Sequence, residues 1–254
     1  MTILDHGLMF AVAMLAGVVN AVAGGGSLLT FPALLAIGID PISASITNTV
    51  GLLPGYVGSA YGYRSEVGRQ RDRVRVLVGP AIVGALLGAW LLVISPAGLF
   101  DAVVPFLILG SAALLAVQPR VAARLVRRRS ATAVVVGVPM VLVAITFLGG
   151  IYGAYFGGAL GVILLAALGS TLTDDLMQVN VLKVVLSLVI NATAVCVFVF
   201  ITDIAWSIVA VMGVGSFVGG QMGTGLAQRL NSEQLRPAVV VFATVMGIVL
   251  LVKN

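Results

Sequence analysis

Charged residues are scarce in this chain. Asp, Glu, Lys and Arg make up 9% of its 254 residues, against about 25% in soluble domains. Apolar residues make up 60%, the mean hydropathy is +1.17, and no polar stretch is long enough for a soluble domain. These values predict an all-α polytopic membrane protein, because helices satisfy every backbone polar group internally within a bilayer.

Several kinds of chemistry are excluded by what is missing. With one cysteine, Cys196, and one histidine, His6, neither a disulfide nor a zinc or haem site built from several such residues is expected. There is no G-x-x-x-x-G-K-[ST] phosphate loop for ATP, and no Ser/His/Asp set away from His6. We therefore predict no cofactor, no metal and no enzymatic activity.

The apolar segments divide the chain into two similar halves. We assign residues 1–118 and 132–254 to two transmembrane repeats of about four helices each, joined by an Arg-rich cytoplasmic linker at 119–131. The repeat is visible in the sequence, where Gly17–Thr30 matches Gly150–Ile163. The apolar segments are 7–23, 27–39, 42–62, 76–94 and 100–118, then 133–156, 159–169, 176–200, 205–224 and 237–252.

One stretch in each half has the wrong length for simple spans. Residues 7–39, as one straight helix, would be roughly 50 Å long against a hydrocarbon core of about 30 Å, and two crossings would need about 40 residues. Glycines also break a helix at roughly 1 kcal/mol each. We therefore predict a re-entrant hairpin in each repeat, with tips at Gly24, Gly25, Gly26 and Ser27 and at Gly157 and Gly158.

The positive charge is concentrated in loops and reports on membrane topology rather than on a nucleic-acid partner. Two spans separate the Arg64–Arg75 loop from the Arg120–Arg129 loop, which places both in the cytoplasm by the positive-inside rule. The Arg229–Arg236 loop joins them only if the hairpins return to the side from which they started. This favours an inverted over a parallel repeat, in the plasma (inner) membrane, with both termini outside.

Lys183 is the only lysine or arginine inside an apolar segment, and an ionisable residue there indicates a functional site. Asn180, Ser187 and Asn191 share its helix face by their spacing. This face suits an oxyanion, and two hairpin tips would add the positive ends of their second helices. The alternative is a lysine near a helix end that reaches the interface.

Other polar residues are candidates for the same substrate site. Thr47, Asn48 and Thr49 occupy the equivalent place in the first half, where they could instead bond their own helix. Asn20 and Ser27 flank the first glycine break and could satisfy broken backbone. Tyr152 and Tyr155 precede the second break, where aromatic packing is an equal alternative.

The motifs resemble those of a known family. Asn20–Pro32 (NAVAGGGSLLTFP) and Thr47-Asn48-Thr49 before Pro54-Gly55 resemble the first half of the sulfite exporter TauE/SafE family. Gly150–Gly157 and Asn180–Lys183 with Asn191 resemble its second half. The resemblance implies a permease for sulfite, organosulfonates such as sulfoacetate, or related small anions. Thr49 stands where some similar members carry a basic residue.

We predict a secondary transporter, and by resemblance an exporter, of small anions in the lipid bilayer, with a midplane site at the hairpin tips and Lys183. An uncoupled anion channel and a carboxylate permease are the alternatives. A membrane enzyme or assembly factor would need a catalytic dyad or soluble module, which the sequence lacks. The small-xxx-small runs at Gly84–Gly88 and Gly215–Gly223 predict close helix packing, within one chain or in a homodimer.

Overall fold

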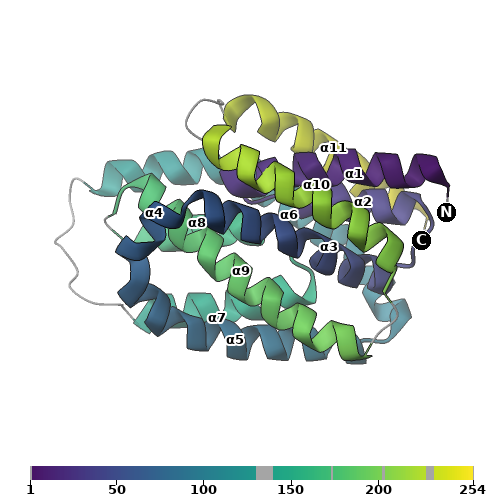
Figure 1. Cartoon of the computed structure of the whole chain (residues 1–254), viewed down its shortest axis with the longest axis horizontal. Helices are drawn as coiled ribbons and strands as arrows, with labels where there is room; N and C mark the ends of the chain where they lie inside the picture. The colour runs from purple at the N-terminus through teal and green to yellow at the C-terminus, as the bar shows by residue number, and fades with distance from the viewer. Residues whose placement is uncertain (1, 130–139, 173, 202–203, 227–231, 254) are drawn as a thin grey trace.

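A computed structural model describes residues 2–129, 140–172, 174–201, 204–226 and 232–253, which are almost entirely helical and form no strand (Figure 1). This confirms the all-helical prediction. The helices are α1 (Ile3–Val22), α2 (Ser27–Ala36), α3 (Pro41–Gly62), α4 (Arg64–Val67), the 3₁₀ turn η1 (Gly68–Gln70), α5 (Arg71–Ile94), α6 (Ala97–Arg129), α7 (Met140–Tyr155), α8 (Leu160–Thr171), α9 (Leu176–Ile201), α10 (Trp206–Leu226) and α11 (Ser232–Lys253).

The same order of helices occurs in both halves. A pair of helices separated by a four-residue break, at 23–26 or 156–159, is followed by three long helices: α3, α5 and α6, then α9, α10 and α11. Figure 1 shows α1 starting at the end that holds both termini, with α2 returning toward it. The pair α7 and α8 opens toward the opposite end, which we call the Arg-rich end because α4, η1 and the start of α5 lie there.

Length and composition make five of the described helices candidate membrane spans: Ile3–Val22, Arg64–Ile94, Gly98–Arg120, Leu176–Phe200 and Trp206–Gly225. This supports an integral multi-pass membrane protein. The helices α2, α7 and α8 are shorter, with 10, 16 and 12 residues. Helix α3 has 22 residues, but the polar side chains between 43 and 49 lower its hydropathy.

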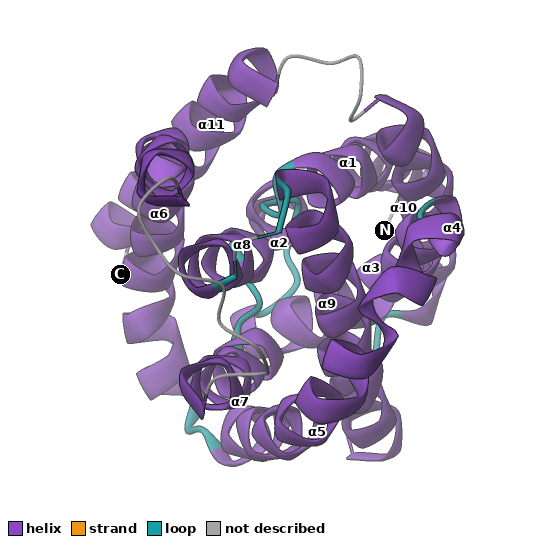
Figure 2. Ribbon diagram, turned by 90° about the vertical axis from the view of Figure 1, so that its left-hand side faces the viewer, coloured by secondary structure: helices purple, strands orange, loops and turns teal. Residues whose placement is uncertain are grey.

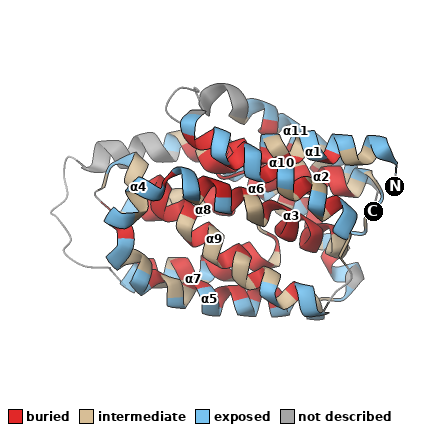
Figure 3. Cartoon of the chain, viewed as in Figure 1, coloured by how far each residue is buried: buried red, intermediate tan, exposed pale blue. Residues whose placement is uncertain are grey.

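Burial separates a central group of helices from an outer ring. Figure 2, viewed from the Arg-rich end, places α2, α8 and α9 inside the ring formed by the other helices. Figure 3 shows buried residues on the central helices and exposed ones on outer faces. Trp90, Phe106 and Val214 are 55%, 64% and 60% exposed. An outer surface of large apolar side chains is suited to lipid.

The glycine-rich runs pack within the chain. In α10, a Cβ built on Gly219 would lie 1.9 Å from the Met14 carbonyl oxygen of α1. In α5, a Cβ on Gly84 or Gly88 would lie 2.1 Å from a carbonyl oxygen of α7. Each half therefore packs its middle long helix on the broken pair of the other half. A homodimer would have to use other faces.

The linker is partly helical. Residues 119–129, assigned to the linker by sequence, continue α6 through Pro119 to Arg129. The remaining linker residues, 130 and 131, lie outside the described part, as do the first residues of the apolar segment at 133–156 and Arg229.

Candidate functional site

The two helix breaks touch each other at the centre of the molecule. Gly24 has φ +88°, and a Cβ added there would lie 2.5 Å from the Cα of Gly161 in the first turn of α8. The reverse distance, from a Cβ on Gly161 to the Cα of Gly24, is also 2.5 Å. The structure thus brings the predicted tips together, with Gly24, Gly25, Gly26, Ser27 and Gly158 buried and Gly157 half-buried.

Two helices begin at this contact. Ser27 starts α2 and Leu160 starts α8, and neither N-terminus has a side-chain cap. Helix N-termini carry partial positive charge. The centre therefore holds two such ends, one from each half of the chain.

Side chains satisfy the backbone of the first break. The Gly26 N–H donates to Asn20 Oδ1 over 2.7 Å, and Gln118 Nε2 of α6 donates to the Ala23 carbonyl over 3.3 Å. Buried backbone groups need such partners. The Asn20 side chain therefore supports the break, as the structural alternative for this residue predicted.

The second break is satisfied in a similar way. The hydroxyl of Tyr152 donates to the Gly158 carbonyl over 2.6 Å, and Ser111 Oγ of α6 donates to the same oxygen over 3.1 Å. Tyr155 lies elsewhere, accepting a 3.4 Å hydrogen bond from Ser95 and packing edge-on against Phe100. Of the two tyrosines, only Tyr152 contacts the break.

One face of α6 therefore supports both breaks, through Ser111 and Gln118 two turns apart. Between them, Leu115 packs on Gly25, where a Cβ would lie 3.1 Å from its Cδ2. Neither polar residue was among the predicted site residues. Their signal was available, because both are polar side chains within an otherwise apolar segment.

Lys183 is buried, at 1% exposure, and its Nζ donates to the Asn20 carbonyl oxygen over 2.9 Å. Within the described ranges, no ion pair within 4 Å joins it to a carboxylate. One turn earlier, Asn180 donates to the Ala21 carbonyl over 3.1 Å. The predicted face of α9 thus lies against the last turn of α1, and the ammonium does not reach the molecular surface.

The same face of α9 continues with Ser187 and Asn191. The Ser187 side chain is 0% exposed, and its hydroxyl has no hydrogen-bond partner among the residues described. The Asn191 amide donates to the Ser187 carbonyl over 2.7 Å. The Tyr56 hydroxyl of α3 interacts with the side chains of Asn191 and Ser27, which brings together candidates from opposite halves.

The three consecutive candidates of α3 have different environments. Asn48 Oδ1 accepts a hydrogen bond from Thr30 of α2, whereas Thr49 Oγ1 donates to its own helix at Ser45 over 2.9 Å. The buried Thr47 hydroxyl has no partner within the part of the chain described. Thr47 is therefore an available donor, Asn48 joins α3 to α2, and Thr49 follows its structural alternative.

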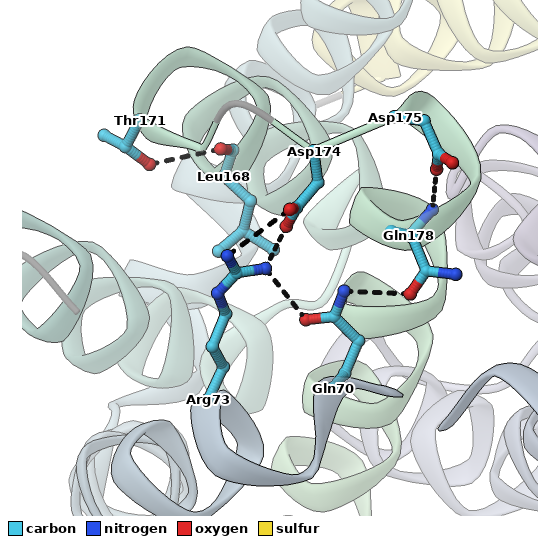
Figure 4. Close-up of polar contacts among 7 residues, drawn as sticks. All are labelled: Gln70, Arg73, Leu168, Thr171, Asp174, Asp175 and Gln178. Carbon is cyan, nitrogen blue, oxygen red and sulfur yellow. Dashed lines mark hydrogen bonds and ion pairs between the residues drawn. The ribbon is translucent and has the colours of Figure 1, made fainter. Parts of the chain in front are cut away.

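A second polar cluster joins the two halves at the Arg-rich end (Figure 4). Arg73 of α5 forms an ion pair with Asp174, which precedes α9. Gln70 Nε2 donates to Gln178 Oε1 over 3.0 Å, and Asp175 Oδ1 accepts from the Gln178 N–H over 2.7 Å, capping α9. Each of the two aspartates thus has a defined partner.

Reversing Asp174 in an Asp174→Arg variant is expected to lower the free energy of unfolding by about 1 kcal/mol, since partly exposed pairs contribute about 0.2–1 kcal/mol and like charges would now meet. The double variant with Arg73→Asp should recover part of this loss. Thermal unfolding in detergent, at low and high salt, measures both. Equal melting temperatures for the single and double variants would contradict the pairing.

Comparison with known proteins matches this architecture to a family. The family model described as "Sulfite exporter TauE/SafE" matches residues 9–250, which include both breaks and Lys183. The chain belongs to the sulfite exporter TauE/SafE family. This confirms the resemblance seen in the motifs.

Individual relatives of this TauE/SafE chain are described as transporters. It is 29% identical over 246 residues to the "Probable membrane transporter protein YfcA" of Escherichia coli K12, covering 96% of this chain and 89% of the relative. It is 29% identical over 250 residues to "Probable membrane transporter protein ORF9" of Sinorhizobium sp., covering 96% and 91%. A probable membrane transporter protein of Haemophilus influenzae is 28% identical over 240 residues, covering 94% and 91%. No solved structure matches.

Family membership makes this TauE/SafE chain a membrane transporter. The described residues contain no group of three or more His, Cys, Asp or Glu placed to hold a metal ion. The centre offers one ammonium, two helix N-termini and the Ser187 hydroxyl, unpartnered within the described ranges, and such groups can bind an anion. It also holds the amide oxygens of Asn180 and Gln118, which have no hydrogen-bond partner among the described residues and can only accept one.

Proposed function

We propose that the chain is a secondary transporter of small anions, sulfite or organosulfonate-like, and that the anion binds where the two breaks meet. The observation that carries this proposal is the buried Lys183 ammonium, which has no carboxylate at ion-pair distance among the described residues. Burying a cation without a counter-ion is costly. An anionic substrate supplies the missing charge.

The hydrogen bonds of Lys183 link anion binding to the conformation of the first break. Its ammonium donates to the backbone carbonyl of Asn20, and the side chain of the same residue accepts from the Gly26 N–H. An anion that draws the ammonium away from this carbonyl changes the contacts of the residue that supports the break. This is a physical means by which substrate can alter the position of α2 relative to α1.

The membrane arrangement that we propose has two re-entrant hairpins in inverted repeats. The pairs α1–α2 and α7–α8 open toward opposite ends of the molecule (Figure 1), and the crosswise packing of α10 on α1 and α5 on α7 supports a two-fold relation between the halves. By the positive-inside rule, the Arg-rich end faces the cytoplasmic side of the plasma (inner) membrane. Export as the direction follows the family description.

Flux measurements in proteoliposomes test the function. We expect saturable uptake of radiolabelled sulfite or sulfoacetate above that of empty vesicles, with stimulation by unlabelled substrate on the opposite side, as an alternating carrier requires. Acetate transport in place of the sulfur anions would favour the carboxylate permease. Flux that neither saturates nor shows counterflow would indicate an uncoupled channel, and the absence of all three fluxes would contradict the substrate class.

A further inference from the structure

A pocket of about 400 Å³ opens at the Arg-rich end. It lies where the end of α3 and α4 meet the first turn of α9 and the end of α10. A water molecule occupies about 30 Å³ of liquid, so the pocket has room for a small hydrated ion. Its lining includes Tyr63, Glu66, Arg69, Met177, Gln178 and Thr224.

Tyr63 stands on the inner side of this pocket. Its side chain is 4% exposed, and its hydroxyl accepts a 3.2 Å hydrogen bond from Asn180 Nδ2. The same amide nitrogen donates to the Ala21 carbonyl, next along the chain from the carbonyl that binds Lys183. A short chain of contacts therefore runs from the pocket to the lysine.

Helix α9 gives the distance along this path. Met177 lines the pocket, Asn180 binds Tyr63 and Lys183 lies beyond, at successive turns of one helix face. With a rise of about 1.5 Å per residue, six residues separate the pocket from the lysine by about 9 Å. The side chains of Tyr63 and Asn180 lie on this path, and Val181 and Val184 of α9 pack in one buried cluster with Tyr63.

The geometry points to the Tyr63–Asn180 pair as a gate that closes an aqueous route from the pocket to Lys183. The identity of the ions that pass rests on the proposed function, whereas the existence of the route does not. Tyr63 sits in the junction between α3 and α4, and opening the gate requires its ring to leave the buried cluster that it forms with Val181 and Val184. Glu66 and Arg69 pair with each other across 2.9 Å in the pocket wall, and Asp175 adds a carboxylate to the lining. The pocket therefore does not itself attract anions, and their selection falls to Lys183.

Cysteine labelling measures this route directly. The native cysteine, Cys196, is exposed and is first replaced by serine. A Ser187→Cys substitution then adds a buried thiol one turn beyond Lys183, at a hydroxyl with no hydrogen-bond partner in the described structure. A membrane-impermeant, anionic methanethiosulfonate is applied from either side, and a separate Ser65→Cys variant at the pocket identifies the Arg-rich side.

We expect slow labelling with Tyr63 in place and, from the Arg-rich side only, a rate at least about tenfold higher in Tyr63→Ala. Tyr63→Phe keeps the ring but loses the hydrogen bond, and should raise the rate about fivefold, as expected for a bond contributing about 1 kcal/mol. Tyr61→Ala is the matched control, because Tyr61 is 57% exposed and stacks on Arg64. This control should leave the rate unchanged.

Unchanged labelling in Tyr63→Phe and Tyr63→Ala, or equal acceleration from both sides or in Tyr61→Ala, would overturn the gate. If Tyr63→Ala does not fold, the phenylalanine variant decides alone. Sulfoacetate tests the proposed function separately, because an anion bound at Lys183 should slow the labelling. Faster labelling in the tyrosine variants without protection by sulfoacetate would support the route and contradict the anion site.

Discussion

Replacing Lys183 with methionine should abolish saturable anion flux while the chain still folds. Removing one partner of a buried, hydrogen-bonded charge pair costs about 2–5 kcal/mol, which is about thirtyfold or more in affinity. The fold should survive because an apolar side chain of similar length replaces a buried cation at little cost in stability. Only the 2.9 Å hydrogen bond to the Asn20 carbonyl is lost.

The measurement compares proteoliposome flux and the melting temperature in detergent for three variants. Lys183→Arg keeps the charge and should retain part of the flux. Lys253→Met removes the only other lysine of the chain, at the end of α11, and should leave flux unchanged. A methionine variant that transports at the wild-type rate would show that the hairpin tips bind the anion without the ammonium.

The positions of the two breaks could be predicted because their causes are local. Three consecutive glycines and a run of the wrong length for a span are visible without any tertiary information, and the structure ends α1 and α7 within one or two residues of the expected tips. Lys183 was identifiable for a similar reason, since a lone cation in an apolar segment is conspicuous. Its burial against Asn20 was not, because that contact joins residues 163 positions apart.

The groups that complete the breaks depend on tertiary packing and were missed. Gln118 reaches a carbonyl 95 residues away, and Ser111 one 47 residues away. The sequence therefore marks both as polar residues in an apolar segment but does not indicate which backbone groups they bind. The sequence likewise left open whether the glycine runs pack on helices of the same chain or of a second chain in a homodimer. Charge counting could place the Arg-rich segments on one side, but it could not pair Arg73 with Asp174.

Gly161→Ala should produce the second large effect, by separating the two breaks. A Cβ at this position would lie 2.5 Å from the Cα of Gly24 and 2.9 Å from its carbonyl oxygen. These are backbone atoms, so one break must move away from the other. Overpacking of this kind costs about 1–3 kcal/mol of stability. In enzyme sites a displacement of about 1 Å can cost about a hundredfold in rate, and we expect a comparable loss of flux here.

Three further glycines separate the contact from other effects of an added methyl group. Gly24→Ala combines the contact with a left-handed backbone, φ +88°, and should be the most damaging. Gly38 has the same φ, but a Cβ added there would have no atom within 4 Å. The Gly38→Ala variant should therefore lose about 1–2 kcal/mol of stability but keep its flux. Gly110 lies in α6 with open space around it, so the Gly110→Ala variant should lose neither stability nor flux.

Melting temperatures in detergent and flux in proteoliposomes, measured on all four variants, separate strain from contact. If flux follows stability across the series, with Gly38→Ala impaired as much as Gly161→Ala, the glycines serve folding alone. If flux is lost only where the added methyl group meets the opposite break, the distance between the N-termini of α2 and α8 controls transport. That result would place the transport step at the contact between the two halves.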